Sequence, residues 1–563
     1  MKDRALTQRR PTRGMARKSA VLSTYPLDNL VSEVHRLLGP TWVLPPYNLL
    51  LPSYLKQPSA SLQQEDIDFL VRKGALDVPD PRFVQECFKA YIRHVHPHLP
   101  FLDLDHFSSI IFASDPERQN ANPSGEKVSL LLYQAVMFSG TFFVDLRHLY
   151  AAGFLSRRSA LETLFQRARV LFDFDAEDDA MAAIQSLLLL TYWYDNPDEL
   201  KDGRHWMSIC KTFAYKAQLH LDYSDHPDWN FRKVLWWCIF TRDRLMSLGL
   251  QQPPMIRDQS ESSIPVLRLD TDDFVISRFR SHIGISYYGD NDIKLARIFV
   301  EKINLCRCIR DDLFSWNCQS TINRSFASQP RRSCLWMSKL EVEDWHRDLP
   351  QNISFRPIPF VTNESDLLLY YHCAWLKMIY LELYSTLHRQ LDFLSDQYSP
   401  RQRLSLALED SNCPVLQSAI ESSEVLQDLN EKHLTSYLTP TSVCMILRTG
   451  ILHVQEVFTS NLQVDDASLR RLLHCILALQ QLGSRYGGAL FVASLFGASS
   501  GSSIVTSSPK DILAHVDVDS LGLLTSRHSE TPVTTVIRIT EPYDVDIVSG
   551  LKSKVGNLKI AAS

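Results

Sequence analysis

The sequence has 563 residues, of which 45% are hydrophobic and 22% are charged, and its formal net charge is −5. A chain of this length can bury one large core or several, and the usual size of a domain gives an expectation of two to four domains. The nearly neutral net charge excludes a protein that coats nucleic acid over its whole surface.

The first twenty residues depart from this balance, because they hold seven basic side chains against one acidic side chain. A short basic run suits a nuclear import receptor or the phosphate backbone of DNA. We therefore predict a basic, disordered arm over residues 1–25, and the alternative is a solvated terminus with no further role. The side chains assigned to nuclear import or to the DNA backbone are Arg9, Arg10, Arg13, Arg17 and Lys18.

No apolar stretch follows the basic start, so the sequence predicts no secretory signal peptide. The longest charge-free apolar run, residues 128–144, contains Gln134, Ser139 and Gly140 and is at the short edge for a membrane span. We interpret this run as a buried core helix and expect no membrane partner. The cysteines are scattered from Cys87 onward, so we expect free thiols in a reducing, intracellular compartment.

In chain order, residues 26–80 combine short helical patterns with proline-dotted stretches, and we predict a linker with short helices there. From residue 81 to about 500, apolar residues recur at three- and four-residue steps, and no convincing alternating strand pattern occurs. The sequence therefore predicts an all-α, multi-helical body. Its clearest helical segments are 81–95, 159–174, 178–194, 203–221, 291–314, 365–391 and 465–486.

Residues 501–563 differ from this body in composition. A segment rich in Gly and Ser leads into them, and residues 531–550 are β-branched and alternating. A hairpin and an irregular tail both fit this pattern. We predict a linker followed by an irregular C-terminal tail.

The segment 94–107 gathers His94, His96 and His98 with several aspartates, and such groups bind zinc or iron. However, Pro97 lies between the histidines, and the first two straddle a helix end, so their side chains point in different directions. We interpret the segment as a helix terminus packed on the core and predict no metal site.

The acidic run over residues 172–181 is the one pattern that resembles an enzyme site. Asp175, Asp178 and Asp179 could bind magnesium as the Asp-rich motif of helical terpene cyclases does. No second metal-binding motif follows, and carboxylates also stabilise the start of the next helix. Phosphate loops, dinucleotide fingerprints and nucleophile elbows are missing from the sequence. We predict no catalytic residues and no enzyme.

Cys306 and Cys308 are too close in sequence to act together on a helix, where they would lie about 200° apart. They cannot chelate one ion without unwinding that helix. We therefore predict two buried free thiols.

The segment 235–256 is apolar and rich in tryptophan, carries Arg242, Asp243 and Arg244 in its middle, and stops at two prolines. A helix that is apolar nearly all round is central in a fold, and its charges must be paired there. We predict an internal ion pair of Asp243 with the two arginines that reaches adjacent helices. Contact with a ligand is the alternative.

This segment resembles a motif in the regulatory middle homology domain of fungal binuclear-zinc-cluster transcription factors. Gln251 and Gln252 depart from the motif, which has Gly-Arg there. Residues 88–107 and 183–222 resemble the opening helix and the central helix pair of the same domain, and residues 53–76 are similar to the cutinase transcription factor subgroup. The matching motif positions are Arg232, Leu235, Trp236, Trp237, Asp243, Arg244, Pro253 and Pro254.

The resemblance implies a regulatory domain over residues 81–360, with residues 361–500 as a further helical part of the same body. It also implies a nuclear regulator of genes read by RNA polymerase II, with a secondary-metabolite cluster or lipid and carbon-source genes as candidate targets. An all-α enzyme like a terpene cyclase, and a helical scaffold or adaptor without a DNA role, are the alternatives.

The family reads DNA through a short module whose six cysteines hold two zinc ions, and residues 1–86 contain no cysteine. We therefore expect no cofactor in this chain, and zinc only if an upstream module exists. Promoter DNA is reached directly only through such a module, and otherwise through a DNA-binding partner. A homodimer or a heterodimer is compatible with both routes.

Overall fold

The computed structural model divides the chain into two compact units, residues 1–52 and 53–563. The basic arm, the start of the predicted linker and the tail 501–563 lie outside the described residues. The structure describes residues 51–112, 125–193, 201–221, 225–257, 271, 290–318, 328–359, 363–393, 413–459 and 466–496.

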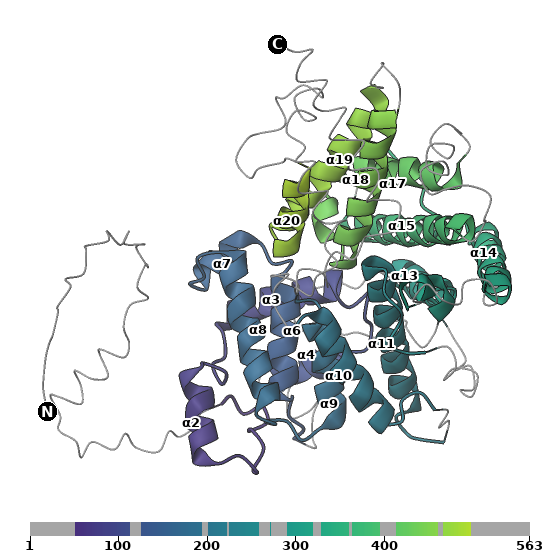
Figure 1. Cartoon of the computed structure of the whole chain (residues 1–563). Helices are drawn as coiled ribbons and strands as arrows, with labels where there is room; N and C mark the ends of the chain where they lie inside the picture. Colours follow the sequence, from purple (N-terminus) through teal and green to yellow (C-terminus); the bar gives the residue numbers. More distant parts are fainter. Residues whose placement is uncertain are drawn as a thin grey trace, which may run out of the picture. The chain divides into compact units, whose positions relative to one another are not determined.

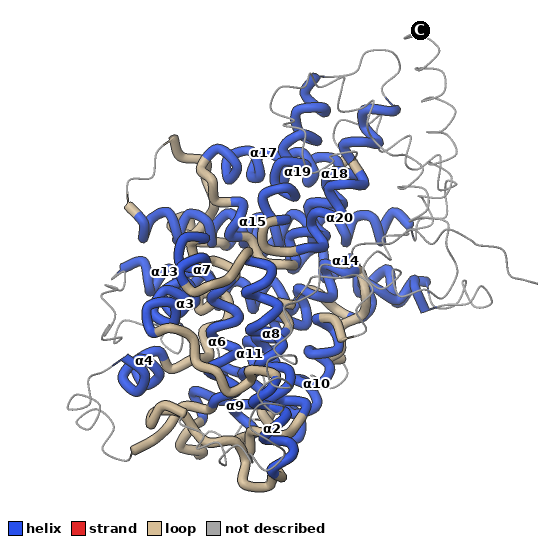
Figure 2. Tube along the Cα trace, turned by 90° about the vertical axis from the view of Figure 1, so that its left-hand side faces the viewer, coloured by secondary structure: helices blue, strands red, loops and turns tan. Residues whose placement is uncertain are grey.

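Every regular element among the described residues is helical, which confirms the all-α prediction (Figure 1). Figure 2 shows helices joined by loops, and the β-type pairing found within these ranges is an isolated bridge between Leu55 and Val128. The helices in chain order are α2 (Gln64–Arg72), α3 (Pro81–His94), α4 (Leu104–Phe112), α6 (Leu130–Thr141), α7 (Leu146–Ala151), α8 (Arg157–Asp173), α9 (Ala180–Leu190), α10 (Gly203–Lys216), α11 (Trp229–Leu250), α13 (Asp290–Arg307), the 3-10 helix η2 (Asp311–Cys318), α14 (Ser328–Asp348), α15 (Glu364–Phe393), α17 (Pro414–Glu431), the 3-10 helix η3 (Thr435–Tyr437), α18 (Thr441–Thr459), α19 (Asp466–Gly483) and α20 (Gly487–Leu495).

The apolar run 128–144 forms α6, the core helix of the first half of this unit. All of its residues are buried, and it packs against α3, α8 and α9. The helix begins where the Ser129 hydroxyl accepts a hydrogen bond from the backbone N–H of Leu132, 3.1 Å away. The buried core helix predicted from this run is therefore confirmed. No helix in the described ranges has the length and apolarity needed to span a membrane.

The helix α11 contacts α10 and α13 and also reaches α18 near the C-terminal end of the described chain. All residues from Lys233 to Gly249 on this helix are buried, so it is surrounded on every side. The central position predicted for this helix is confirmed. It ends at Gln251, whose φ of +50° lies in the left-handed region, and Pro253 and Pro254 follow.

The second half is organised around α15, which packs against α13, α14 and α17. The helices α17, α18 and α19 contact one another, and α20 packs on α19. One predicted helix, residues 291–314, is divided in two, because α13 ends at Arg307 and η2 begins at Asp311. The backbone carbonyl of Ile309, between them, accepts a hydrogen bond from Arg244 of α11.

Candidate functional site

Arg242 of α11 is buried and ties this helix to the end of α9. Its Nε donates to the Thr191 hydroxyl at 2.9 Å and its Nη2 to the Thr191 carbonyl at 2.8 Å. The guanidinium also lies 4.8 Å from the centre of the Tyr192 ring. Burial lowers the pKa of Arg242 from its ordinary value.

Asp243 is 1% exposed and holds the turn that follows α11. Its carboxylate accepts hydrogen bonds from the backbone N–H groups of Met255, at 3.1 Å, and Ile256, at 3.0 Å. Burial raises the pKa of Asp243, while these hydrogen bonds and the charges of Arg244 and Arg204 act against the rise. The side chain therefore fixes the path of the chain just beyond the two prolines.

Arg244 reaches a third neighbour of α11. Its Nη1 donates to the carbonyl of Ile309 at 2.7 Å, and its guanidinium lies 4.8 Å from the centre of the Phe240 ring. The three charged residues thus contact three different parts of the fold. A direct ion pair of Asp243 with Arg242 and Arg244 stays a prediction.

The other motif positions serve packing around the same helix. Arg232 donates to the backbone carbonyl of Ala217 at the end of α10, and Leu235 is completely buried. Trp236 packs edge-on against Tyr215, with 5.7 Å between ring centres, and Trp237 against Phe240, with 5.4 Å. In the turn, Pro253 offers its carbonyl to Arg204 and Pro254 is buried.

The acidic run lies at the surface between α8 and α9. Asp175, Asp178 and Asp179 are exposed, and the Asp179 carboxylate accepts a hydrogen bond from the N–H of Met181 at the start of α9. This arrangement is the helix cap considered as the alternative to a magnesium site. Cys306 and Cys308 are buried free thiols, as predicted.

The histidine segment is packed on the core at the end of α3. His94 stacks on Tyr437 with 4.2 Å between ring centres, and the Nε2 of His98 lies 2.9 Å from the Tyr371 hydroxyl. Within the described ranges, no group of three His, Cys, Asp or Glu side chains is placed to hold a metal ion. This is the packed helix end expected from the sequence.

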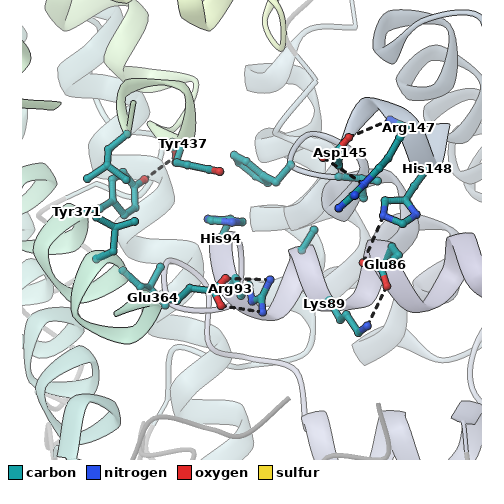
Figure 3. A pocket seen from close by; sticks show the side chains of 16 residues that line it. Glu86, Lys89, Arg93, His94, Asp145, Arg147, His148, Glu364, Tyr371 and Tyr437 are labelled. Carbon is teal, nitrogen blue, oxygen red and sulfur yellow. Dashed lines mark hydrogen bonds and ion pairs between the residues drawn. The ribbon is translucent and has the colours of Figure 1, made fainter. Parts of the chain in front are cut away.

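A cavity of about 280 Å³ lies beside His94, and the sequence did not predict it (Figure 3). We call it the α3–α15 pocket, because one face of α3 and the first turns of α15 form two of its walls. The turn between α6 and α7, the start of α7 and residues 434–437 complete it. Its lining comes from four parts of the chain, so no local sequence pattern could have indicated it.

The mouth of the α3–α15 pocket carries ion pairs, whereas its inner end is aromatic and apolar. At the inner end, the ring centre of His94 lies 5.1 Å from that of Phe143 and 4.2 Å from that of Tyr437, and the buried Tyr371 also lines the pocket. The ion pairs at the mouth are Arg93 with Glu364 at 3.1 Å, Lys89 with Glu86 at 2.8 Å, and Arg147 with Asp145 at 3.5 Å.

Two further arginines lie behind the aromatic wall. Arg485 lies 5.7 Å from the ring centre of Phe143 and donates its Nε–H to the carbonyl of Phe142 at 2.9 Å. Arg157 donates to the same carbonyl, also at 2.9 Å. Neither arginine has a carboxylate within ion-pair distance in the part of the chain that the structure describes. Burial lowers the pKa of Arg157 to about 10, which leaves its guanidinium charged at neutral pH.

His94 is neutral in this setting. Burial lowers the pKa of its imidazole well below the ordinary range, and the positive charges of Arg485 and Arg93 lower it further. A neutral imidazole has one N–H donor and one acceptor nitrogen, so the ring can exchange hydrogen bonds with a polar group in the pocket.

The described body is thus an all-α scaffold whose central helix uses its charged groups for packing, with one mixed aromatic and charged pocket beside α3. Residues 88–421 match the family model described as the fungal specific transcription factor domain. The match covers more than half of the chain, and the chain therefore belongs to this family. The resemblance inferred from the tryptophan-rich helix is confirmed.

Known fungal transcription factors are similar to this chain over much of its length. Cutinase transcription factor 1 beta of Fusarium vanettenii is 29% identical over 476 residues, which cover 80% of this chain and 53% of that protein. Transcription factor cpaR of Aspergillus oryzae is 28% identical over 477 residues, which cover 80% and 76% of the two chains.

A shorter match is the fusaric acid cluster transcription factor FUB12 of Gibberella moniliformis, which is 26% identical over 189 residues, covering 33% of this chain and 26% of that protein. The chain spans about half the length of several of the curated relatives it matches. No solved structure matches the chain.

Proposed function

We propose that this chain is the regulatory body of a fungal transcription factor that controls genes read by RNA polymerase II. The observation that carries the proposal is the family match over residues 88–421, which includes the buried motif on α11. The relatives' names suggest candidate targets, namely cutinase genes and a fusaric acid cluster. Lipid or carbon-source genes and a secondary-metabolite cluster are the two target classes that we propose.

Recognition of promoter DNA then comes from a six-cysteine zinc module in a longer form of the chain or from a DNA-binding partner, and the body can act as a homodimer or heterodimer. The basic arm directs the protein to the nucleus and adds a sequence-independent attraction to DNA, which weakens as salt rises. Its contributing side chains are Arg9, Arg10, Arg13, Arg17 and Lys18.

We propose no catalytic activity. A terpene cyclase would need the acidic run to face a cavity, whereas Asp175, Asp178 and Asp179 are exposed in the segment between α8 and α9. Neutralising Asp175 and Asp178 together as asparagine therefore leaves the regulatory output unchanged. A loss of output in this double variant would favour a metal-dependent role for the acidic run.

A reporter assay tests the regulatory role without knowledge of the natural promoter. The full chain is fused to a bacterial operator-binding domain that has no effect of its own, and the operator is placed upstream of a reporter gene in a fungal host. We expect reporter transcription to change several-fold, upward for an activator and downward for a repressor. An unchanged reporter, with the fusion protein intact and bound to its operator, would support a scaffold without a DNA role.

A further inference from the structure

The α3–α15 pocket has the size and the polarity gradient of a small-molecule site. Its inner residues Tyr371 and Leu434 are 1% and 3% exposed, whereas the side chain of Glu364 at the mouth is 63% exposed. A volume of about 280 Å³ equals that of about nine water molecules, so the pocket fits a molecule of about ten to fifteen non-hydrogen atoms.

Positive charge dominates the surroundings of His94. Arg93 and Arg485 both act on its imidazole, and the first turn of the 30-residue helix α15 lines the same pocket. The N-terminal end of such a helix carries about half a positive charge. Each carboxylate of the pocket lining is paired with a cation, whereas Arg157 and Arg485 behind the aromatic wall have no such partner among the described residues, so the pocket as a whole favours an anionic ligand over a cationic one.

Two polar atoms at the pocket have unused hydrogen-bonding capacity. The Nε of Arg93 and the Nδ1 of His94 are buried and have no hydrogen-bond partner among the described residues. Nearly all buried polar groups in folded proteins are paired, so adjacent unpaired groups need an explanation. A ligand with an acceptor oxygen can supply the missing partner when Arg93 reorients.

The ion pair between Arg93 and Glu364 can be broken at small cost in free energy, so that Arg93 can pair with another anion. The side chains of Arg93 and Glu364 are 33% and 63% exposed, and such surface pairs contribute little free energy. Glu364 can therefore turn into solvent at small cost, which frees the guanidinium. A carboxylate that replaces it from inside the pocket can form two parallel charge-assisted hydrogen bonds with Arg93.

We propose that the α3–α15 pocket binds a small carboxylic acid whose apolar or aromatic body lies against His94, Phe143 and Tyr437. The acid group pairs with Arg93, and the body excludes water from the aromatic end. That the bound acid acts as an effector rests on the proposed regulatory function, whereas the binding itself does not.

Isothermal titration calorimetry of the purified full chain tests the charge preference with three probes of one shape. The probes are 3-phenylpropionate, its neutral amide 3-phenylpropanamide, and the cation 3-phenylpropylamine. We expect the acid to bind at least tenfold more tightly than the amide or the amine. Equal affinities, preference for the amine, or no heat from any probe would each overturn the proposal.

Variants locate the bound acid. Arg93→Gln is expected to weaken the binding of 3-phenylpropionate at least tenfold while leaving the affinity for the amide unchanged. Arg347→Gln is the matched control, because Arg347 is 71% exposed and pairs with Asp344 on α14, away from the pocket lining. Equal weakening, or no weakening, in the two variants would place the acid elsewhere and overturn the assignment.

Filling the cavity provides an independent check. Ala90 lies on the pocket face of α3, and Ala90→Phe should abolish binding of all three probes. Thermal unfolding verifies that the variant is folded, and if it is not, the comparison of Arg93→Gln with Arg347→Gln decides alone. The titration needs no promoter, so it tests binding separately from regulation. If the chain binds the acid but fails the reporter assay, the binding site is supported and the effector role is rejected.

Discussion

Asp243 shows how one buried carboxylate can define the end of a helix. Replacing it with alanine leaves the N–H groups of Met255 and Ile256 without their acceptor and removes a negative charge near Arg244. We expect Asp243→Ala to lower the free energy of unfolding by about 3 kcal/mol. Urea unfolding measures the change.

Asp178→Ala, at an exposed position, is the control and should stay within about 0.5 kcal/mol of the wild type. Equal losses in both variants would contradict the role assigned to Asp243.

Two buried histidines make the stability depend on pH. Burial lowers the pKa of His96 and of His372 to about 3, against an ordinary value of 6.5. Between these values the unfolded chain binds protons that the folded chain does not, so their contribution is complete above about pH 6.5 and is lost as the pH falls toward 3. Each histidine contributes a slope of about 1.4 kcal/mol per pH unit in this window.

The free energy of unfolding, measured by urea titration between pH 7 and pH 5, tests this expectation. His96→Phe removes one of the buried histidines and should make the decline with falling pH less steep than in the wild type. Parallel curves for the two proteins would mean that His96 has the same pKa in the folded and the unfolded chain.

At the scale of helices, the contact between α3 and α6 depends on a residue without a side chain. A Cβ atom at Gly140 would lie 2.2 Å from the backbone carbonyl oxygen of Cys87, far inside contact distance. Gly140→Ala must therefore separate two buried helices, and we expect a loss of about 3 kcal/mol in the free energy of unfolding.

The matched control for this prediction is Gly153→Ala. Gly153 has a φ of +88°, and a Cβ atom added there would meet no other atom within 4 Å, so only backbone strain of about 1 to 2 kcal/mol applies. Chemical denaturation of both variants compares the two costs. If Gly153→Ala were the more damaging change, close packing of α3 on α6 would not be the governing factor.

The sequence predicted the ends of a helix well where a capping residue or a proline marks them. Asp80 and Pro81 begin α3, and the predicted segment 81–95 matches Pro81–His94. The break after Arg307 could not be predicted, because it depends on Arg244, which takes the carbonyl of Ile309 from a distant helix. The apolar periodicity continues through this break and hides it.

At the scale of the whole molecule, burial of α11 was predictable and its partners were not. An apolar surface all round implies a central helix, but the acceptors and donors that satisfy Arg242 and Asp243 come from other segments. Gln251 stands where the family motif has glycine, and its φ of +50° lies in the left-handed region that glycine adopts most readily. The α3–α15 pocket was beyond sequence reasoning, because residues 86 and 437 become neighbours only in the folded chain.

The basic arm supplies the last prediction at this scale, and it concerns where the whole protein goes. Five positive charges at Arg9, Arg10, Arg13, Arg17 and Lys18 form the run that an import receptor can bind. Replacing all five with alanine should lower the nuclear-to-cytoplasmic ratio of a fluorescent fusion several-fold in a fungal host. The charge-preserving control replaces the four arginines with lysine and should keep the protein nuclear, because recognition of the run depends on its positive charge. Nuclear accumulation of the alanine variant at the wild-type level would assign import to another part of the chain or to a partner that carries it.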